Sequence, residues 1–351
     1  MNNRPILGIT MGDPSGIGPE IALKALFEES VYNECRPVLI GDIKVFNKAL
    51  KMLGNPLFTL NPIGEIENCK FEHGIIDIYD LDLVDIEKLK IGKVDAMSGN
   101  AAFQCVKTVI DLALQNKIDA TITGPLNKES LNMAGHQYSG HTEIYADLTE
   151  TKDYSMMLAE DDLKVVHVST HVSLRTACDL VKKERVLAVI ELAYKACQDL
   201  GINFPRIAVS GLNPHAGENG MFGTEEINEI IPAITEAKTK GINVSGPHPP
   251  DTVFSKAIGG MFDIVVAMYH DQGHIPLKVL GFNFDKQTQR WNAVNGINVT
   301  LGLPIIRSSV DHGTAFGHAW TATANYASMM HAIDYGIMLA RVRVSRSKNE
   351  N

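Results

Sequence analysis

The chain has 351 residues, of which 45% are hydrophobic and 21% are charged, and its formal net charge is −9. This length and composition predict a globular protein with one large α/β body or two smaller domains. The acidic balance argues against binding to nucleic acid or to a membrane surface, and no apolar run approaches the roughly 18 residues of a membrane span.

Five cysteines are scattered along the chain without a C-x-x-C pair. Such spacing is typical of buried thiols in a reducing compartment rather than of a disulfide framework. Residues 1–4 lead into a predicted strand and lack the apolar segment of a secretory signal. We therefore expect a cytoplasmic protein.

The first predicted strand, residues 5–10, leads through the glycine-rich loop 12–18 into an amphipathic helix. Gly16 and Gly18 resemble part of a dinucleotide-binding fingerprint, but Ile21 occupies the place of the third glycine, so a Rossmann site is not predicted. The loop could bind an anion through its backbone N–H groups, or it could be only a tight turn between strand and helix.

Strands and helices alternate along the rest of the chain. Further strands are expected to end near residues 42, 123, 171, 210 and 267, with helices over about 45–52, 100–115, 183–199, 225–239 and 326–341. This alternation predicts an α/β fold with a largely parallel sheet. Two segments are interpreted as loops: residues 270–278, where Gly273 and Pro276 argue against a helix, and the polar stretch 282–295.

Residues 139–143 place a serine, a histidine and a threonine at the start of a predicted helix that continues through Leu148. Ser139 or Thr142 could merely cap the helix. Capping does not account for His141, so the other interpretation is an anion held on the free N–H donors of the first turn.

A histidine follows each of three apolar strands, at His171, His215 and His270. Three neutral imidazoles could hold a divalent ion and leave positions open for a substrate. Their separation in sequence matches no local metal motif, so spacing alone does not decide this point. His167 lies within a strand and is interpreted as a core residue, and His274 as a residue that supports His270.

Several segments together resemble the 4-hydroxythreonine-4-phosphate dehydrogenase family; they are residues 11–20, 139–143, 213–218, 269–274, 296–304 with Arg307, and 311–316. The resemblance covers nearly the whole chain. It implies a fold like isocitrate and isopropylmalate dehydrogenases, with two α/β subdomains and a cleft between them. The expected subdomains are residues 1–128 with 305–351, and a dimer-forming subdomain of residues 129–304.

The resemblance also implies NAD or NADP, one divalent metal ion per site (zinc, magnesium, cobalt or similar) and a homodimer with shared active sites. The implied metal ligands are His171, His215 and His270. The implied substrate contacts are His141, Thr142, Lys278, Asn298 and Arg307. The implied nucleotide contacts are His312, Gly313, Thr314 and Ala315. Lys278, Asp251 and Asp271 are the candidates for proton transfer or ligand orientation, although the two acids could equally be structural.

Within the family, residues 163–171 and 273–278 resemble the branch that acts on D-threonate 4-phosphate or D-erythronate 4-phosphate. The implied reaction oxidises the 3-hydroxyl of the acid and then releases CO2, which leaves dihydroxyacetone phosphate. The alternative is a 4-hydroxy-L-threonine 4-phosphate dehydrogenase of pyridoxal phosphate biosynthesis. A metal-dependent hydrolase and a binding protein that has lost its chemistry are further alternatives.

The sequence departs from the family pattern at two places. The connection 282–295 is longer than usual and carries Trp291, and Gly317-His318 replaces an Asp-Ile pair. The first departure bears on the choice of substrate, and the second on the choice between NAD and NADP.

Overall fold

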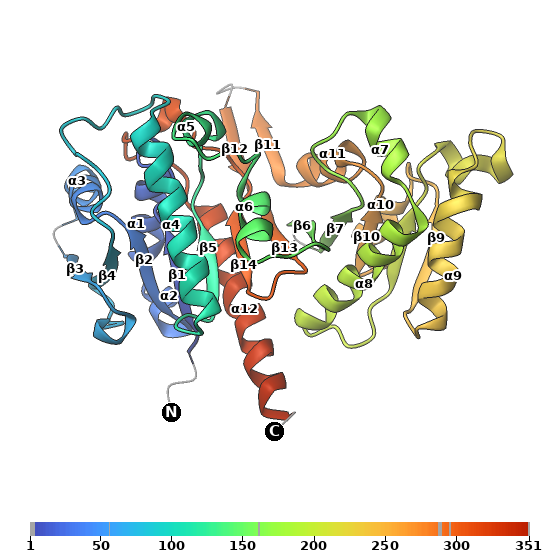
Figure 1. The fold of residues 1–351 in the computed structure, drawn as a ribbon, viewed down its shortest axis with the longest axis horizontal. Helices are drawn as coiled ribbons and strands as arrows, with labels where there is room; N and C mark the ends of the chain where they lie inside the picture. The colour runs from blue at the N-terminus through green and yellow to red at the C-terminus, as the bar shows by residue number, and fades with distance from the viewer. Residues whose placement is uncertain (1–3, 56, 161, 287–289, 295, 350–351) are drawn as a thin grey trace. The chain divides into compact units, whose positions relative to one another are not determined.

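The computed structural model describes residues 4–55, 57–160, 162–286, 290–294 and 296–349 (Figure 1). The chain forms two compact units, residues 1–151 with 303–351 and residues 152–302. Residues 129–151 belong to the first unit, whereas the sequence interpretation assigned them to the second. The reason is that helices α5 (Lys128–Met133) and α6 (His141–Leu148) pack against α4 (Ala96–Leu114). The first three residues, on which the expectation about a leader segment partly rested, lie outside the described ranges.

The first unit contains a parallel sheet. Its strand order is β3 (Thr59–Ile63), β4 (Ile75–Asp80), β2 (Arg36–Gly41), β1 (Ile6–Thr10), β5 (Ala120–Thr123) and β14 (Arg307–Val310). Helix α4 packs against β1, β2 and β5, and α12 (Ala327–Asn349) packs against β5 and β14. The remaining helices are α1 (Gly18–Leu26), α2 (Glu29–Glu34) and α3 (Ile43–Leu53). Covering by helices explains why β1 and β5 are runs of buried residues, since a parallel sheet is usually buried on both faces.

The second unit contains a mixed sheet. Its order is β13 (Ile297–Leu301), β6 (Ser155–Glu160), β7 (Leu163–His167), β10 (Ile264–Ala267), β8 (Ile207–Ser210) and β9 (Val244–His248), and the pairs β13–β6 and β6–β7 are antiparallel. Its helices are α7 (Leu174–Leu180), α8 (Lys183–Asp199), α9 (Ile231–Thr239), α10 (Val253–Ile258) and α11 (His270–Gly281). Because β7, β10 and β8 are parallel neighbours, the segments that follow them leave the sheet at the same edge.

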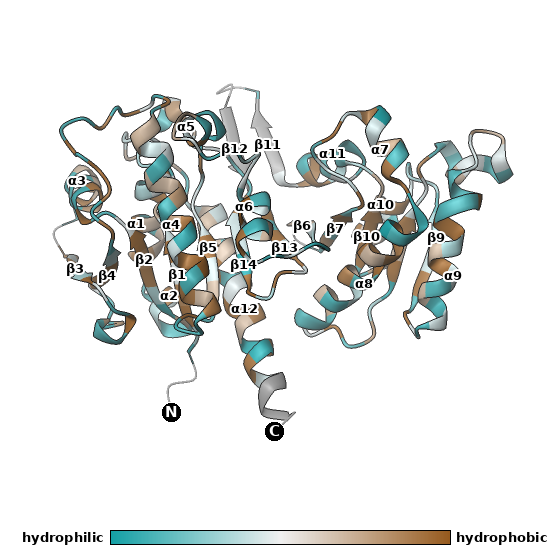
Figure 2. Cartoon of the chain, viewed as in Figure 1, coloured by the Kyte–Doolittle hydropathy of each residue, from teal (hydrophilic) through white to brown (hydrophobic). Residues whose placement is uncertain are grey.

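Apolar residues concentrate on the strands and on the helix faces turned toward them, as the colouring of each unit shows (Figure 2). In the second unit, Leu163, Val165 and Val265 belong to one buried cluster with Leu277 of α11. No helix in the described part of the chain is long and apolar enough to cross a membrane. The α/β class expected from the sequence is confirmed.

The interpretation of residues 270–278 as a loop is wrong, because residues 270–281 form helix α11. Gly273 does not break this helix. A Cβ atom at Gly273 would collide with Nε2 of His167 and lie 2.7 Å from Cγ1 of Val165, so the missing side chain lets α11 approach β7. Pro276 costs the helix one backbone N–H donor, and the helix continues past it.

The interpretation of residues 282–295 as a polar loop is also wrong. The strands β11 (Phe282–Asp285) and β12 (Arg290–Val294) pair in antiparallel fashion, while residues 287–289 and 295 lie outside the described ranges. The sequence Phe-Asn-Phe-Asp over 282–285 alternates apolar and polar residues, which is the pattern of a strand.

Candidate active site

A buried guanidinium lies in the first unit. Arg307 is the first residue of β14 and is 2% exposed. It donates hydrogen bonds to the Oγ1 atoms of Thr142, at 3.5 Å, and Thr123, at 3.2 Å, and its Cζ lies 5.6 Å from the centroid of the Tyr145 ring. Burial lowers its pKa to about 10, so the side chain stays charged at neutral pH.

The start of α6 lies against this cation. The N-cap residue is Gly140, which makes no side-chain capping bond, and the hydroxyl of Thr142 accepts from Arg307 instead. Capping by Ser139 or Thr142 therefore does not explain the segment. The Nε2 atom of His141 is buried, and no hydrogen-bond partner for it is found among the described residues. Burial, followed by the charge of Arg307, holds the pKa of His141 well below its usual value, so the imidazole is neutral.

Tyr145 and Thr123 were not predicted as part of this group. Tyr145 is fully buried and donates to Oγ1 of Thr121 at 2.9 Å, so its ring has a fixed place beside the guanidinium. The only sequence signal was the position of Thr123 at the end of an apolar strand. The group combines a cation, a hydroxyl and a neutral imidazole, which suits a phosphate or a carboxylate.

Two of the three histidines proposed as metal ligands lie together in the second unit. His270 begins α11, His171 follows β7, and their ring centroids are 5.8 Å apart. The Nδ1 of His270 donates to Oδ1 of Asp271 at 2.6 Å. This bond fixes the proton on Nδ1 and leaves the lone pair of Nε2 for a ligand, as carboxylate partners do for metal-binding histidines. His274 stacks on His270 with ring centroids 3.6 Å apart.

The third histidine is not joined to this pair. Within the described residues, no three His, Cys, Asp or Glu side chains are arranged to hold a metal ion. His215 lies on the loop after β8 and contacts Oε1 of Glu218 through Nδ1 at 3.2 Å. Imidazole is a donor that zinc and related ions accept readily, so the residues fit a divalent ion chemically, but the described part of one chain brings together two of the three predicted ligands.

His167 is a core residue, as the sequence indicated. It is fully buried, and its Nδ1 donates to the carbonyl of Met156 at 3.3 Å. Burial, with a contribution from His274, lowers its pKa to about 3. Its ring centroid lies 4.7 Å from that of His274, so a neutral imidazole packs behind the His270–His274 stack.

The other predicted residues of the second unit are spread over three elements. Lys278 is half-buried on α11, about two turns beyond His270. Asn298 lies on β13, and its Nδ2 contacts Sδ of Met156 at 2.6 Å. Asp251 is exposed in the turn before α10. The roles of these three residues remain predictions.

The predicted nucleotide-binding residues form a turn after β14 in the first unit. His312 contacts the carbonyl of Gly313 at 3.0 Å through Nδ1, and burial lowers its pKa. A side chain at Gly313 would meet no atom within 4 Å, so the backbone is open on that side. Thr314 is 6% exposed, and Ala315 has a φ of 45° in the left-handed region. Their contact with a nucleotide remains a prediction.

The glycine-rich loop is a tight turn that packs against this segment. The backbone N–H of Asp13 donates to the carbonyl of Pro125, and that of Ile17 donates to the carbonyl of Thr314. The N–H groups of Ser15 and Gly16 donate to Oδ1 and to the carbonyl of Asp13, respectively. A Cβ atom at Gly16 would lie 2.8 Å from the carbonyl oxygen of Thr314. Since these donors are used within the protein, the structure favours the turn over an anion site.

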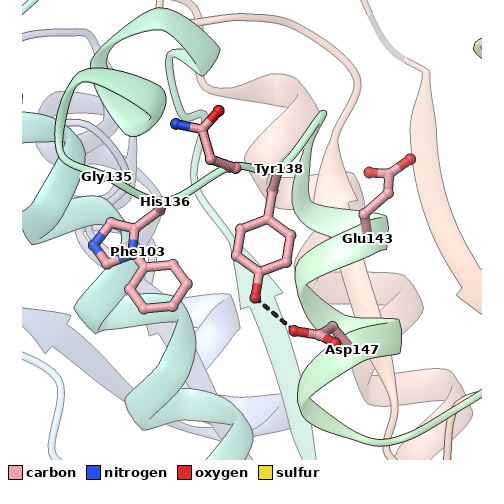
Figure 3. Close-up of a pocket in the computed structure, with 7 residues that line it drawn as sticks. Phe103, Gly135, His136, Tyr138, Glu143 and Asp147 are labelled. Carbon is pink, nitrogen blue, oxygen red and sulfur yellow. Dashed lines mark hydrogen bonds between the residues drawn. The ribbon is translucent and has the colours of Figure 1, made fainter.

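A pocket of about 480 Å³ opens in the first unit beside α6, the helix that begins at His141 (Figure 3). It is lined by Phe103, Gly135, His136, Gln137, Tyr138, Glu143 and Asp147, none of which was predicted as a site residue. The Phe103 and His136 rings stack with centroids 3.7 Å apart, and Tyr138 donates to Asp147 at 2.6 Å. Phe103 is 8% exposed, so one ring serves both the packed face of α4 and the wall of the pocket.

Comparison with known proteins gives a consistent result. The model of the family described as pyridoxal phosphate biosynthetic protein PdxA matches residues 33–336. The D-threonate 4-phosphate dehydrogenase of Salmonella typhimurium is 48% identical over 334 residues, which are 95% of this chain and 98% of that protein. The protein of the same name from Pectobacterium atrosepticum is 47% identical over 335 residues, which are 95% and 99% of the two chains.

Solved structures agree with this result. The 4-hydroxythreonine-4-phosphate dehydrogenase from Klebsiella pneumoniae has a TM-score of 0.84 and 44% identity, covering 96% of this chain and 99% of that one. A terephthalate 1,2-cis-dihydrodiol dehydrogenase from Burkholderia xenovorans has a TM-score of 0.67 and 28% identity, covering 95% and 98%.

Proposed function

The chain belongs to the family of the pyridoxal phosphate biosynthetic protein PdxA, and on this premise we propose that it is a dehydrogenase of a 4-phosphorylated four-carbon acid. The substrate is D-threonate 4-phosphate or D-erythronate 4-phosphate, whose 3-hydroxyl is oxidised with NAD as the hydride acceptor. Loss of CO2 from the resulting β-keto acid gives dihydroxyacetone phosphate. Relatives at 47% and 48% identity that carry the D-threonate name support this substrate class.

The observation that carries the proposal is the buried Arg307 beside Thr142 and the Nε2 atom of His141. A protein with a net charge of −9 needs a local cation to hold a dianionic phosphate, and Arg307 retains its charge because its pKa of about 10 lies well above neutrality. A guanidinium offers a planar set of donors that matches phosphate oxygens. We assign this group to an anionic end of the substrate.

We propose that His171 and His270 hold a divalent ion together with His215. When bound, such an ion supplies Lewis-acid stabilisation of negative charge on the substrate oxygen. Asp271 keeps the Nδ1 proton of His270 in place, so that Nε2 stays available. Lys278, on the same helix, is proposed to hold a substrate oxygen and to exchange a proton with it, with Asp251 as a second candidate for the proton transfer.

We further propose a homodimer with shared sites, in which His215 of the partner subunit completes the metal-binding set. Two observations support it. Only two of the predicted ligands lie together in the described part of one chain. In addition, α11 exposes Ile275 and Val279, one turn apart, at 59% and 76%. Large apolar side chains on the helix that carries His270 are suited to an interface.

The five free cysteines fit a reducing compartment, and we propose a cytoplasmic location.

The test is NADH formation with three candidate substrates, the 4-phosphates of D-threonate, D-erythronate and 4-hydroxy-L-threonine, with and without a chelator. We expect turnover of the first two that a chelator removes and that zinc, magnesium or cobalt restores. A parallel series with NADP identifies the nucleotide. Absence of turnover for all three substrates with metal present would contradict the proposal.

The second candidate function is the oxidation of 4-hydroxy-L-threonine 4-phosphate. The name of the Klebsiella pneumoniae structure favours it, at 44% identity. A clear preference for that substrate in the same assay would select this function, whereas substrate loss without any nucleotide would point to a hydrolase.

A further inference from the structure

The loop that carries His215 has a left-handed backbone. In the segment Pro214–Gly220, the five residues from His215 to Asn219 have φ values between 43° and 83°. Four of the five carry a side chain, and the left-handed region is unfavourable for such residues because Cβ approaches the following carbonyl. A run of this kind persists only where surrounding contacts hold it.

A buried carboxylate binds the two residues that lead into this run. Glu226 is 2% exposed, although it is an acid. Its Oε1 accepts hydrogen bonds from the backbone N–H groups of Leu212 at 2.7 Å and Asn213 at 2.8 Å, and its Oε2 accepts from Nδ2 of Asn213 at 2.9 Å. Three bonds to one short segment explain how the charge is accommodated away from water.

The loop is wrapped closely around this carboxylate. A Cβ atom at Gly217 would lie 2.7 Å from Oε2 of Glu226, and one at Gly211 would lie 3.1 Å from Oε1. Two glycines therefore leave room for the carboxylate inside the loop. Contacts both before His215 and after it converge on the same side chain.

The helix that presents Glu226 is itself irregular. Residues 226–230 form a π-helical turn, a rare form that occurs frequently at functional sites. Glu225, immediately before this turn, also accepts from Nδ2 of Asn213, at 2.8 Å. The side-chain NH2 group of Asn213 thus donates to two consecutive carboxylates, Glu225 and Glu226, and is held more firmly than by either one alone.

We infer that Glu226 is a positioning residue that holds the 214–220 loop in its left-handed form and thereby fixes the direction of the His215 imidazole. The imidazole contacts Glu218 within the same loop, so both side chains follow the loop backbone. The inference rests on the proposed function, in which His215 is a metal ligand.

The experiment compares the full-length protein with Glu226→Gln and with Glu229→Gln as a matched control. Glutamine keeps an acceptor for the two backbone N–H groups but turns an NH2 group toward the amide of Asn213. Glu229 lies in the same π-helical turn and accepts from the backbone of Lys183 instead, at 2.8 Å. Amide hydrogen exchange is measured on the metal-free proteins, and zinc affinity by competition with a chelating dye.

We expect Glu226→Gln to raise exchange over residues 212–220 and to weaken zinc binding about 10- to 100-fold, as loss of a supporting partner does at other metal sites. Glu229→Gln should leave both quantities at the wild-type level. If the amides of residues 212–220 exchange at the wild-type rate in Glu226→Gln, the inference is overturned. It is also overturned if these amides exchange faster while the zinc affinity of Glu226→Gln is unchanged.

Failure of the proposed function gives a different result, because the wild-type protein would then bind no zinc and turn over no substrate. The exchange rates alone would in that case decide whether Glu226 holds the loop. If Glu226→Gln does not fold, Asn213→Ala removes the amide that joins the two carboxylates, and the same increase in exchange over 212–220 is required of it.

Discussion

Arg307 carries a full charge at a position that is 2% exposed, and the two hydroxyls that it contacts are neutral. Arg307→Lys keeps the charge but removes the planar fork that reaches Thr142 and Thr123. We expect KM for the phosphorylated acid to rise about tenfold or more, with a smaller change in kcat, because the lost contact is to a part of the substrate that does not react.

Steady-state kinetics at saturating nucleotide measure this effect, and a thermal melt shows whether the variant is folded. Arg206→Lys, at a guanidinium that pairs with Asp263 on the surface of the second unit, is the matched control, whereas the pocket of Figure 3 is lined by residues of α6 itself. A KM for Arg307→Lys within about twofold of wild type would count against the assignment of Arg307 to an anionic end of the substrate.

Asp13 provides a pH test in the same unit. It is fully buried, and burial raises its pKa from 3.8 to about 6. Because the pKa is higher in the folded state, the protonated carboxyl contributes to the free energy of unfolding. That contribution is fully present below pH 3.8 and is lost as the pH rises through about 6. Asp13→Asn keeps an oxygen for the Ser15 N–H but cannot ionise.

We therefore expect the free energy of unfolding of Asp13→Asn, relative to that of the wild type, to increase between about pH 4 and pH 7, by roughly 3 kcal/mol at most. Urea denaturation at a series of pH values measures the difference. A difference that is the same at every pH would show that Asp13 does not titrate in this range.

Single residues were predictable where their chemistry is local. His141 and Thr142 are recognisable at the start of a predicted helix, whereas Arg307 was implied only by the family resemblance; the structure joins Thr142 to Arg307. Tyr145 was not proposed, because a tyrosine on an apolar helix face gives no sign that a guanidinium lies 5.6 Å from its ring. Glu226 was missed for the same reason, since its partners lie on another element.

Helix α11 shows how an element can be misjudged from its sequence. Glycine and proline usually interrupt a helix, and both occur between His270 and Lys278. The glycine serves a tertiary contact instead, because it faces His167 on a strand that lies about a hundred residues earlier in the chain. Local propensity cannot reveal such a contact, whereas the regular helix at 183–199 was predicted with its observed limits.

Gly273→Ala tests this explanation. In an open helix the change from glycine to alanine stabilises by roughly 1 kcal/mol. Here the new methyl group would collide with His167 and lie 2.7 Å from Val165, so we expect a loss of about 1–3 kcal/mol in the free energy of unfolding. Gly64→Ala, where a Cβ would meet no atom within 4 Å, is the control and should be close to neutral. Stabilisation by Gly273→Ala would show that α11 and β7 have room to separate.

At the level of the whole molecule, the family resemblance implied two α/β subdomains divided after residues 128 and 304, whereas the two compact units divide after residues 151 and 302. The structure places residues 129–151 with the first unit because α5 and α6 pack on α4, a contact that spacing along the chain does not reveal. The predicted metal ligands show a second limit. The three histidines were recognisable as residues after strands, but whether one chain assembles them is a matter of tertiary and quaternary packing.

The proposed homodimer is tested at the exposed face of α11. Val279 is 76% exposed, and a glutamate there would bring a charge into the proposed interface, where its desolvation is costly. We expect the wild type to sediment at twice the mass of one chain and Val279→Glu to sediment as a monomer. If the partner supplies His215 to the metal-binding set, Val279→Glu should also lose zinc affinity in parallel with the loss of dimer. Phe204→Glu, at a residue that is 89% exposed in the loop before β8, should remain dimeric and bind zinc normally. A monomeric wild type would exclude the shared site, and a dimeric Val279→Glu protein would place the interface on another face.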